Sequence, residues 1–438
     1  MMRGLAQGAR SLLPKIIYRK VAPFYHYMLA FFGALLYRFP SRNIFVIGIT
    51  GTKGKTTTVE IINAILEEAE FKTALAGTLR FKIAESDSRN MFKMTMPGRF
   101  HLQKFLRDAV SAGCTHAIIE MTSEGARQFR HKFIYLDALI FTNLSPEHIE
   151  SHGSYEAYVQ AKLKLARALE TSPKKEKVLV ANADSKEVEK FLSIKSVRKI
   201  PYRLSDAEPY TATADGSTIT FLGEKIPVCL PGVFNIYNIL GAAFFARSQN
   251  IPIETIKRGI ERISFVRGRM EKVSVMKKNG MPFNEFNIYV DYAHTADSLE
   301  KVYVALGSRD KICVLGGTGG GRDKWKRAEM GKIAAEHCKK IILTNEDPYD
   351  EDPVAIVEEI KKGIGKEKDV EIEMDRREAI RKAVFHARPG DAVIVTGKGT
   401  DPFIMGPRGT KISWDDASVA REVLEDYIER RTENIDKL

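Results

Sequence analysis

The stretch IFVIGITGTKGKTTTV, residues 44–59, decides the fold of the chain around it. Its apolar first half predicts a buried strand, its closely spaced glycines predict a tight turn, and the apolar spacing from Val59 to Leu66 predicts a helix. In such a unit, backbone N–H groups and the helix N-terminus surround an anionic phosphate chain. We therefore predict a nucleotide site whose loop residues are Gly51, Thr52, Gly54, Lys55, Thr56 and Thr57.

Two side chains of this loop have specific chemical roles. Lys55 is placed to reach the β- and γ-phosphates, and the Thr56 hydroxyl is placed to ligate Mg²⁺. The strict phosphate-loop spacing asks for glycine where this chain has Ile49. The alternative interpretation is an ordinary glycine-rich turn, but the strand before it, the helix after it and the Gly-Lys-Thr ending favour nucleotide binding.

After this loop the chain alternates between apolar strands and helices, which is typical of α/β proteins with a mostly parallel sheet. We expect strands at 44–49, 117–121, 138–142, 178–181, 288–291, 312–315, 341–344 and 392–396, and helices at 59–66, 101–112 and 154–170. Period-two spacing around Asp215-Gly216 predicts a small antiparallel hairpin. The predicted domains are a helical segment at 1–42, a P-loop-type nucleotide-binding domain at 43–265 and a Rossmann-like α/β domain at 266–438.

Composition and charge exclude several classes of protein. The 438 residues are 44% hydrophobic and 28% charged, which indicates a globular chain of two or three domains rather than a disordered one. Of the net charge of +12, residues 1–43 contribute seven basic side chains and no acidic one, which leaves +5 for the rest. Because the charge is not concentrated on a folded domain, we expect no nucleic-acid partner.

The four cysteines lie far apart in the sequence, at Cys114, Cys229, Cys313 and Cys338. They form no CxxC pair, so we expect neither a zinc ribbon nor a disulfide scaffold. This cysteine usage suits a reducing, cytoplasmic compartment.

An apolar run of 16 residues, FYHYMLAFFGALLYRF at 24–39, follows the basic N-terminal lead. It is shorter than the ~20 residues that span a bilayer, and a poor cleavage sequence follows it. Two interpretations remain open. The run is an interfacial helix with its aromatic rings among lipid headgroups and basic side chains on anionic lipid, or it is a helix packed on the protein's own body, over a sheet edge.

Eight motifs occur in an order that resembles the Mur ligases. They are TGTKGKTTT, AIIEMTSEG, FTNLSPEHIESHG, PGVFNIYN, GRME, VDYAHTADSL, GGRDKWKR and TGKGTD. The resemblance runs from about Ile44 to the C-terminus, and within the family it is strongest to the type that adds the third residue of the peptidoglycan stem peptide. It implies an enzyme that uses ATP to convert a carboxylate into an acyl phosphate, which an amine then attacks to form an amide.

A metal site is predicted beside the phosphates. Glu120 ends an apolar strand, where its carboxylate is placed to hold Mg²⁺ together with Thr56. The resemblance adds His148 as a ligand of a second metal ion, after Glu147 where the family has aspartate, and Lys162 as a metal-binding carbamate.

Helical spacing gives separate support for Lys162. The sequence places it on one stripe with Tyr155, Tyr158, Ala166 and Leu169, whereas Lys164 points the opposite way. A lysine on a buried stripe has a lowered pKa, and its neutral amine can react with CO₂. The alternative is a lysine whose amine extends to water.

The resemblance also assigns residues later in the chain to ATP. Asn235 and Asn238 resemble the pair that contacts adenine. Arg269, Asp291 and His294 resemble the second domain's contribution to ATP and the reacting phosphate, where an arginine would neutralise developing charge. The catalytic residues so implied are Lys55, Lys162, His148, Arg269 and Asp291.

The substrate residues follow from the same resemblance, and they are Thr95, Pro97, Ser123, Arg322, Glu346, Asp347, Tyr349, Lys398 and Asp401. Tyr349 stands where members that add diaminopimelate have an arginine for its distal carboxylate. The acidic surroundings at 346–351 suit an ammonium side chain such as that of lysine, or form a solvated acidic loop. The family's UDP-sugar domain takes about a hundred residues before the phosphate loop, and only about 43 stand there, so whether the acceptor is UDP-linked or lipid-linked stays open.

We therefore expect a cytoplasmic ligase that joins a free amino acid to a muramoyl-peptide carboxylate, with residues 1–42 as a possible contact with the inner membrane face. One alternative keeps the chemistry but changes the acceptor, as in folylpolyglutamate or cyanophycin ligases. Another is a nucleotide-binding module that has lost catalysis, against which the retention of Lys55, Thr56, Glu120, His148 and Lys162 argues.

Overall fold

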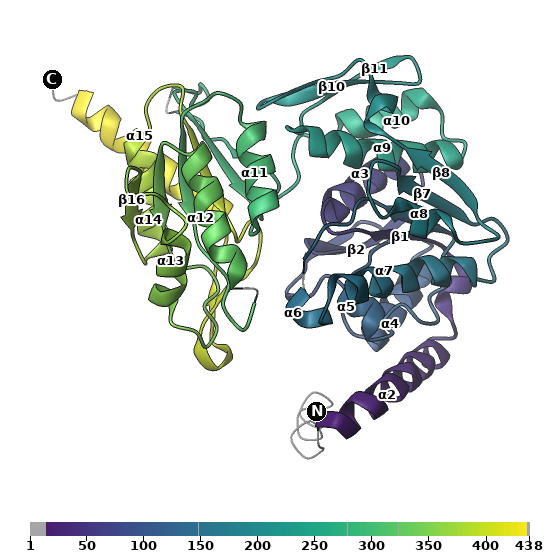
Figure 1. Ribbon diagram of the computed structural model, residues 1–438. Coiled ribbons are helices and arrows are strands. Elements are labelled where there is room, and N and C mark those ends of the chain that lie inside the picture. The colour runs from purple at the N-terminus through teal and green to yellow at the C-terminus, as the bar shows by residue number, and fades with distance from the viewer. Residues whose placement is uncertain (1–14, 148, 278, 323, 436–438) are drawn as a thin grey trace. The chain divides into compact units, whose positions relative to one another are not determined.

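The predicted first strand, β1 (Phe45–Thr50), lies within an eight-stranded sheet of order β4-β3-β2-β5-β1-β6-β7-β8 (Figure 1). The structure is a computed structural model that describes residues 15–147, 149–277, 279–322 and 324–435. The other strands are β2 (Thr73–Ala76), β3 (Arg80–Ile83), β4 (Ser86–Arg89), β5 (His116–Glu120), β6 (Ala138–Phe141), β7 (Val178–Asn182) and β8 (Arg198–Tyr202). In this order, the six strands β2, β5, β1, β6, β7 and β8 pair in parallel. β3 and β4 pair antiparallel and extend the sheet beyond β2. Parallel strands are buried on both faces, which explains their nearly continuous apolar sequences.

Helices cover both faces of this sheet. Apolar side chains of α4, α5, α7 and α8 share one core with the sheet, while α3 contacts β1, β2 and β5 from the other side (Figure 1). The helices of this part of the chain are α3 (Lys55–Glu68), α4 (Arg99–Ser111), α5 (Ser123–Arg127), α6 (Ile149–His152), α7 (Tyr155–Glu170), α8 (Val188–Leu192), α9 (Val233–Ser248) and α10 (Ile253–Glu261).

The predicted hairpin is confirmed as a three-stranded antiparallel sheet of order β11-β10-β9. It consists of β9 (Thr211–Thr213), β10 (Gly216–Phe221) and β11 (Glu224–Val228), and Thr213 pairs with Gly216 across the turn.

A second, six-stranded sheet has the order β12-β13-β17-β14-β15-β16, with β12 antiparallel to the rest. Its strands are β12 (Glu271–Val273), β13 (Asn287–Asp291), β14 (Lys311–Leu315), β15 (Lys340–Leu343), β16 (Asp369–Ile372) and β17 (Ala392–Thr396). One face packs against α11 (Ala296–Ala305), α12 (Trp325–His337) and α13 (Pro353–Lys361). The other packs against α14 (Arg376–His386) and α15 (Asp416–Ile435), and a short pair, β18 (Phe403–Met405) with β19 (Lys411–Ser413), follows β17.

These elements form two compact units. One comprises the described parts of 1–147, 154–203 and 238–259, and the other those of 148–153, 204–237 and 260–438. All eight predicted strands and all three predicted helices are present, which confirms the α/β class.

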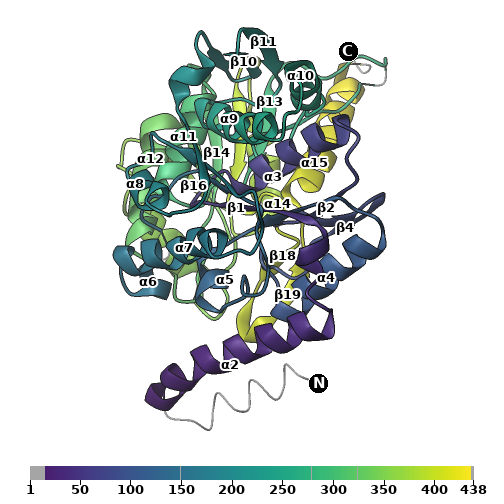
Figure 2. The ribbon, with the colours of Figure 1, turned by 90° about the vertical axis from the view of Figure 1, so that its right-hand side faces the viewer.

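The N-terminal apolar run lies in helix α2 (Lys15–Leu36), which begins nine residues before the predicted start. Its small residues Ala30, Gly33 and Ala34 are buried, and a β-carbon built on Gly33 would lie 3.6 Å from Phe100 of α4. Figures 1 and 2 both show α2 beside α4. The interpretation of a helix packed on the protein's own body is therefore confirmed, but α2 packs on helix α4 rather than over a sheet edge. Among the described residues, no helix has the length and apolar character needed to cross a membrane.

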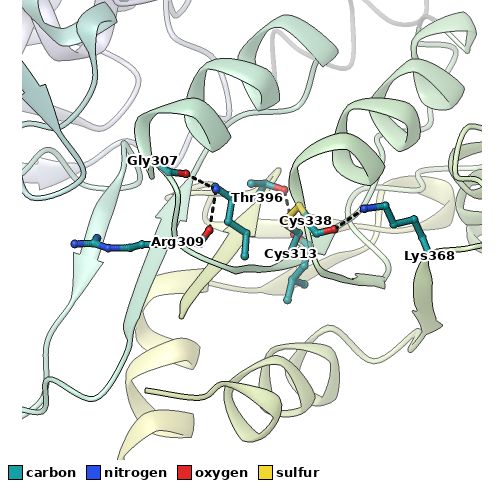
Figure 3. The surroundings of a disulfide bond; sticks show 8 residues. Gly307, Arg309, Cys313, Cys338, Lys368 and Thr396 are labelled. Carbon is teal, nitrogen blue, oxygen red and sulfur yellow. Dashed lines mark hydrogen bonds between the residues drawn. A yellow bond between two sulfur atoms is a disulfide. The ribbon is translucent and has the colours of Figure 1, made fainter. Parts of the chain in front are cut away.

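One disulfide bond joins Cys313 of β14 to Cys338, which follows α12 (Figure 3). The sequence predicted no disulfide scaffold, and this single bond is not one, but the spacing of 25 residues gave no signal for it. The pair forms because β14 and β15 are neighbours, which brings the two α-carbons to 6.1 Å. Cys114 and Cys229 are free thiols.

Candidate active site

The predicted phosphate loop lies between β1 and α3 and is fastened to the segment after β6. The Thr52 N–H donates to the Asn143 carbonyl at 2.9 Å, and the Lys53 N–H donates to Asn143 Oδ1 at 2.9 Å. Thr142 Oγ1 donates to the Lys53 carbonyl at 2.6 Å. β1 and β6 are parallel neighbours, so their carboxyl ends meet here. Thr142 was not predicted to touch the loop, although the same strand-end reasoning could have found it.

At two positions of the loop only glycine fits, because a neighbouring side chain lies too close to the backbone for a β-carbon. A β-carbon on Gly51 would lie 1.9 Å from Thr142 Oγ1, and one on Gly54 would lie 2.1 Å from Asn238 Oδ1. Gly54 also has a φ of 83°, which L-side chains rarely adopt. Asn238 therefore lies against the phosphate loop, and its contact with adenine stays a prediction.

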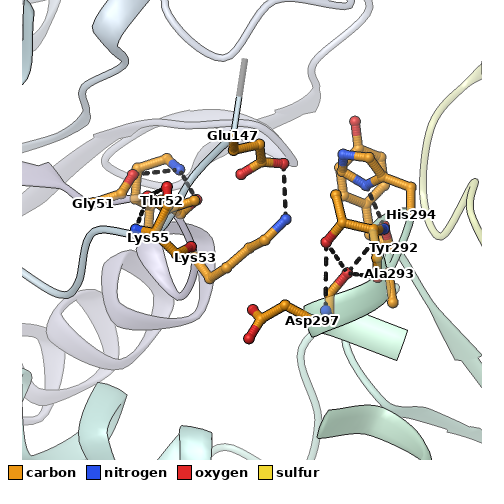
Figure 4. Close-up of polar contacts among 12 residues, drawn as sticks. Gly51, Thr52, Lys53, Lys55, Glu147, Tyr292, Ala293, His294 and Asp297 are labelled. Atoms are coloured by element: carbon orange, nitrogen blue, oxygen red, sulfur yellow. Dashed lines mark hydrogen bonds and ion pairs between the residues drawn. The ribbon is translucent and has the colours of Figure 1, made fainter. Parts of the chain in front are cut away.

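Two lysines donate to one backbone carbonyl of the loop. Lys55 Nζ donates to the carbonyls of Gly51 at 3.0 Å and Thr52 at 2.9 Å (Figure 4), and Lys162 Nζ donates to Gly51 at 2.7 Å. Lys162 is only 2% exposed. Burial, and secondly the positive charge of Lys55, hold the pKa of Lys162 well below its usual value.

The helical stripe predicted around Lys162 is confirmed except at Tyr155, which is half-buried. Tyr158, Ala166 and Leu169 of α7 are buried with it, whereas Lys164 is only half-buried. The Tyr158 hydroxyl lies 2.9 Å from Thr52 Oγ1, and the ring of Tyr158 lies 5.0 Å from Lys162 Nζ. The alternative of a lysine that extends to water is therefore wrong.

Glu120 is 1% exposed and accepts hydrogen bonds on both carboxylate oxygens. Thr56 Oγ1 donates to Oε1 at 3.1 Å, and the N–H and hydroxyl of Thr78 donate to Oε2 at 2.8 and 2.9 Å. A hydroxyl and a carboxylate on the phosphate side of a sheet are the oxygen ligands that Mg²⁺ takes, with substrate phosphates and water completing its shell. Thr56 and Glu120 therefore fit the predicted ion.

The predicted second metal set, His148 with the Lys162 carbamate, stays a prediction, because one of its members is not among the described residues. The described residues contain no group of three or more histidine, cysteine, aspartate or glutamate side chains that could hold a metal ion. His148 lies outside the described residues. The neighbouring Glu147 pairs with Lys53 at 2.8 Å, as Figure 4 shows.

The predicted acceptor residues lie in the segment between β4 and α4 and at the start of α5. Thr95 Oγ1 lies 2.8 Å from Thr78 Oγ1, Pro97 is buried, and Ser123 is the first residue of α5. Arg130 donates to the Met96 carbonyl and so fixes this segment from the far end of α5. No sequence signal pointed to Arg130.

Asn235 and three predicted ATP residues belong to the second unit. Asn235 Nδ2 donates to the Pro231 carbonyl at 2.8 Å. Asp291 accepts the N–H groups of Met270 and Ala293, each at 2.7 Å, so its carboxylate shapes the backbone on either side.

The side chains next to Asp291 surround a tyrosine ring. The Arg269 guanidinium lies 4.7 Å from the centre of the Tyr292 ring, and His294 Nδ1 lies 2.8 Å from the Tyr292 carbonyl (Figure 4). A guanidinium stacked in this way keeps its positive charge.

Lys398 is the centre of the predicted amino-acid site. It is 1% exposed, and Nζ donates to Asp347 at 2.8 Å, Asp401 at 3.1 Å and the Phe403 carbonyl at 2.6 Å. An ammonium has three N–H donors, so these contacts use all of them.

The predicted acidic loop is only partly solvated. Asp350 is exposed, whereas Glu346 and Asp347 are buried, so the solvated-loop interpretation is wrong for these two. Thr318 donates to Glu346 Oε1 at 2.7 Å, while Oε2 is buried without a hydrogen-bond partner, and burial raises the pKa of this carboxyl. Glu351 forms an ion pair with Arg327, an arginine that is buried.

Tyr349 is half-buried at the edge of this site, beside Gly320, where a β-carbon would lie 2.9 Å from its ring. Burial raises the pKa of its hydroxyl. The negative charges of Asp347 and Asp401 raise this pKa further, whereas the positive charges of Arg322 and Lys398 lower it.

Comparison with known proteins agrees with this geometry. Residues 49–246 match the Mur ligase middle domain, and residues 268–399 match the Mur ligase glutamate ligase domain. UDP-N-acetylmuramyl-tripeptide synthetase 2 of Oceanobacillus iheyensis is 34% identical over 406 residues, which cover 90% of this chain and 80% of that protein. The UDP-N-acetylmuramoyl-L-alanyl-D-glutamate–2,6-diaminopimelate ligase of Syntrophomonas wolfei is 35% identical over 410 residues, with 90% and 81% covered.

Two solved structures are similar in fold. A UDP-N-acetylmuramoyl-L-alanyl-D-glutamate–2,6-diaminopimelate ligase has a TM-score of 0.59 at 27% identity and covers 88% of this chain and 79% of its own. Folylpolyglutamate synthase of Mycobacterium tuberculosis, solved with ADP, has a TM-score of 0.67 at 17% identity, with 84% and 91% covered, a likeness of fold alone.

Proposed function

Because the chain belongs to the Mur ligase family, we propose that it is an ATP-dependent ligase that joins an amino acid to the carboxylate of a muramoyl dipeptide in peptidoglycan stem-peptide synthesis. The observation that carries this proposal is the phosphate loop with Lys55, Lys162 and Glu120 around it. Residues 43–265 are the ATP-binding domain in this proposal, and residues 266–438 supply the amino-acid site and the ATP contacts of Arg269, Asp291 and His294.

The chemistry follows from the charges around the loop. The acceptor carboxylate attacks the γ-phosphorus of ATP, and the bond to the leaving ADP oxygen breaks. Lys55 stabilises the charge that develops on the transferring group. Mg²⁺, when bound at Thr56 and Glu120, neutralises phosphate charge. The amino-acid nitrogen then attacks the acyl carbon, a proton is lost and phosphate leaves, while the predicted substrate residues near Tyr349 orient the donor.

The direct test is phosphate release with a panel of amino acids and acceptors, followed by mass spectrometry of the products. UDP-linked and lipid-linked muramoyl dipeptides are the acceptors that support the proposal. If the protein turned over only with a folate or a cyanophycin-type peptide, the proposed acceptor would be wrong. ATP binding without phosphate release would indicate a nucleotide-binding module that lacks catalysis.

Diaminopimelate should be a poorer donor than lysine or another amino acid without a second carboxylate. Tyr349 stands where an arginine would grip that carboxylate, and the loss of a charge-assisted bidentate pair costs ~2–3 kcal/mol, roughly 30- to 150-fold in kcat/KM. Lys398 cannot replace the arginine, because its three donors are used within the protein.

The measurement is kcat/KM for both donors in the wild type and in Tyr349→Arg, which should shift preference towards diaminopimelate. A wild-type preference for diaminopimelate would contradict the prediction. Its loss in Arg322→Ala would then identify Arg322 as the residue that binds the distal carboxylate.

We further propose a cytoplasmic enzyme whose N-terminal 42 residues contact the inner face of the membrane peripherally. The large side chains opposite the buried face of α2 are exposed, Phe24 by 68% and Leu36 by 65%. Phe32 and Leu35 lie on this same side and are half exposed. The seven basic residues of this segment have no acidic neighbour in sequence, and each basic residue near anionic lipid contributes ~1 kcal/mol. The charge complementarity favours an anionic bilayer over a second copy of this basic segment.

Full-length protein should sediment with anionic liposomes at low salt, and a chain that starts at Ser41 should not. Serine at Phe24, Phe32 and Leu35 should also reduce sedimentation, because these side chains do not support the contact with α4. A matched control is Leu222→Ser, which removes an equally exposed apolar side chain from the β10–β11 turn. If full-length protein stays in the supernatant, the proposed membrane contact is wrong.

A further inference from the structure

Thr78 lies between the acceptor segment and the carboxylate of Glu120. It follows β2, whose parallel neighbour β5 ends at Glu120, so the sheet brings the two residues together. Its hydroxyl lies 2.9 Å from Glu120 Oε2 and 2.8 Å from Thr95 Oγ1. Thr56 of the phosphate loop contacts the other carboxylate oxygen at 3.1 Å.

The directions of these hydrogen bonds are fixed by chemistry. An ionised carboxylate only accepts, and a hydroxyl has one proton to donate. Thr78 gives that proton to Glu120, so the bond from Thr95 to Thr78 must be donated by Thr95. The result is a directed chain, Thr95 to Thr78 to Glu120, with Thr56 donating from the opposite side.

The Thr78 hydroxyl is not required to form the turn in which it lies. The Gly77 N–H donates to the Arg80 carbonyl, and Asn90 Nδ2 donates to the Gly77 carbonyl at 2.8 Å, so the backbone of this turn is held by other bonds. The Thr78 N–H also contacts Glu120 independently of its side chain. The hydroxyl therefore serves the orientation of Glu120 and Thr95 rather than the local fold.

We propose that Thr78 is a positioning residue that orients Glu120 towards the metal–nucleotide and couples it to Thr95 in the acceptor segment. This inference rests on the proposed function, since it assigns Thr95 to the acceptor and Glu120 to Mg²⁺. When the acceptor binds at Thr95, the hydrogen bond that Thr95 donates to Thr78 changes. Because the same Thr78 hydroxyl donates to Glu120, the change alters the position of Glu120 as well. By linkage, metal–nucleotide binding must change acceptor affinity by the same factor.

The test is calorimetric binding of a nonhydrolysable ATP analogue to the whole protein, with excess Mg²⁺ and with EDTA. Thr78→Val should weaken binding about tenfold with Mg²⁺ and less than twofold with EDTA, because only the metal-bound complex uses Glu120. Thr78→Ser, which keeps the hydroxyl, should bind within twofold of the wild type. Thr115→Val is the matched control, since Thr115 precedes β5 at the end opposite Glu120.

The same titrations with and without saturating UDP-linked muramoyl dipeptide measure the coupling. The wild type should show at least a threefold change in analogue affinity, and Thr78→Val should show none. The inference would be overturned if Thr78→Val lost the same affinity with Mg²⁺ as with EDTA, or if Thr78→Ser bound the analogue as weakly as Thr78→Val. Coupling in Thr78→Val equal to that of the wild type would also overturn it. A wild type that binds no analogue would overturn the proposed function as well, which separates the two failures.

Discussion

Lys162→Ala should abolish ligation, and added bicarbonate should fail to restore it. The amine of Lys162 is buried against the Gly51 carbonyl of the phosphate loop, and its lowered pKa leaves the neutral form that can react with CO₂. The alanine variant has no amine to carbamylate, so bicarbonate has no site to act on. A short-chain carboxylic acid in solution should restore part of the activity if a carboxylate is what the site needs.

Turnover is measured by phosphate release, with Lys164→Ala as the matched control two residues away. Lys164 is half-buried and lies over the Phe129 ring, away from the loop, so its variant should keep near-wild-type turnover. Lys162→Met separates chemistry from stability. Methionine occupies the buried stripe without an amine to desolvate, so this variant should be inactive with a Tm no lower than that of the wild type. Near-wild-type turnover in Lys162→Ala would refute the assignment.

Lys55→Ala should remove ATP-dependent acyl phosphate formation and leave the fold intact. The ammonium of Lys55 donates to two backbone carbonyls of the loop, and its loss removes charge stabilisation rather than core packing. We expect a decrease of roughly 10²–10³-fold in turnover, which is typical for one preorganised charge at a reacting group.

The acyl phosphate can be trapped with hydroxylamine, and circular dichroism reports the fold. Lys53→Ala is the matched control in the same loop, because Lys53 pairs with Glu147 at a partly exposed position and such pairs contribute about 1 kcal/mol or less. Turnover and ATP affinity that both stay unchanged in Lys55→Ala would count against the role of the loop.

The buried strands were predictable because short, nearly continuous apolar runs between helices are typical of the central strands of a parallel sheet. Strands such as β4 (Ser86–Arg89) and β16 (Asp369–Ile372) were missed because edge strands are exposed and polar, so neither hydrophobicity nor alternation marks them. The start of α2 at Lys15 was missed because its first turns are basic and the apolar run begins only at Phe24.

In the site, the sequence pattern predicted contacts within one helix or loop. It missed contacts between residues that are brought together only by the order of strands in the sheet. The buried stripe of Lys162 follows from helical spacing within α7 and was predicted apart from Tyr155, which is half-buried. The contact of Thr78 with Glu120 depends on β2 lying next to β5, and sequence alone does not give that strand order. The burial of Arg327 was missed for the same reason, since its partners Glu351 and Glu359 come from later elements.

The geometry of the phosphate loop also bears on how such loops are recognised in other sequences. Glycine is required here at 51 and 54, where a side chain would collide with Thr142 and Asn238. Position 49, where the usual consensus demands glycine, is an ordinary buried strand residue in this chain. A search that requires the full consensus would reject this sequence. A search that requires glycine only where a side chain would collide with a neighbour would accept it. Mutational tolerance should follow the same division, with apolar substitutions accepted at Ile49 and none accepted at Gly51.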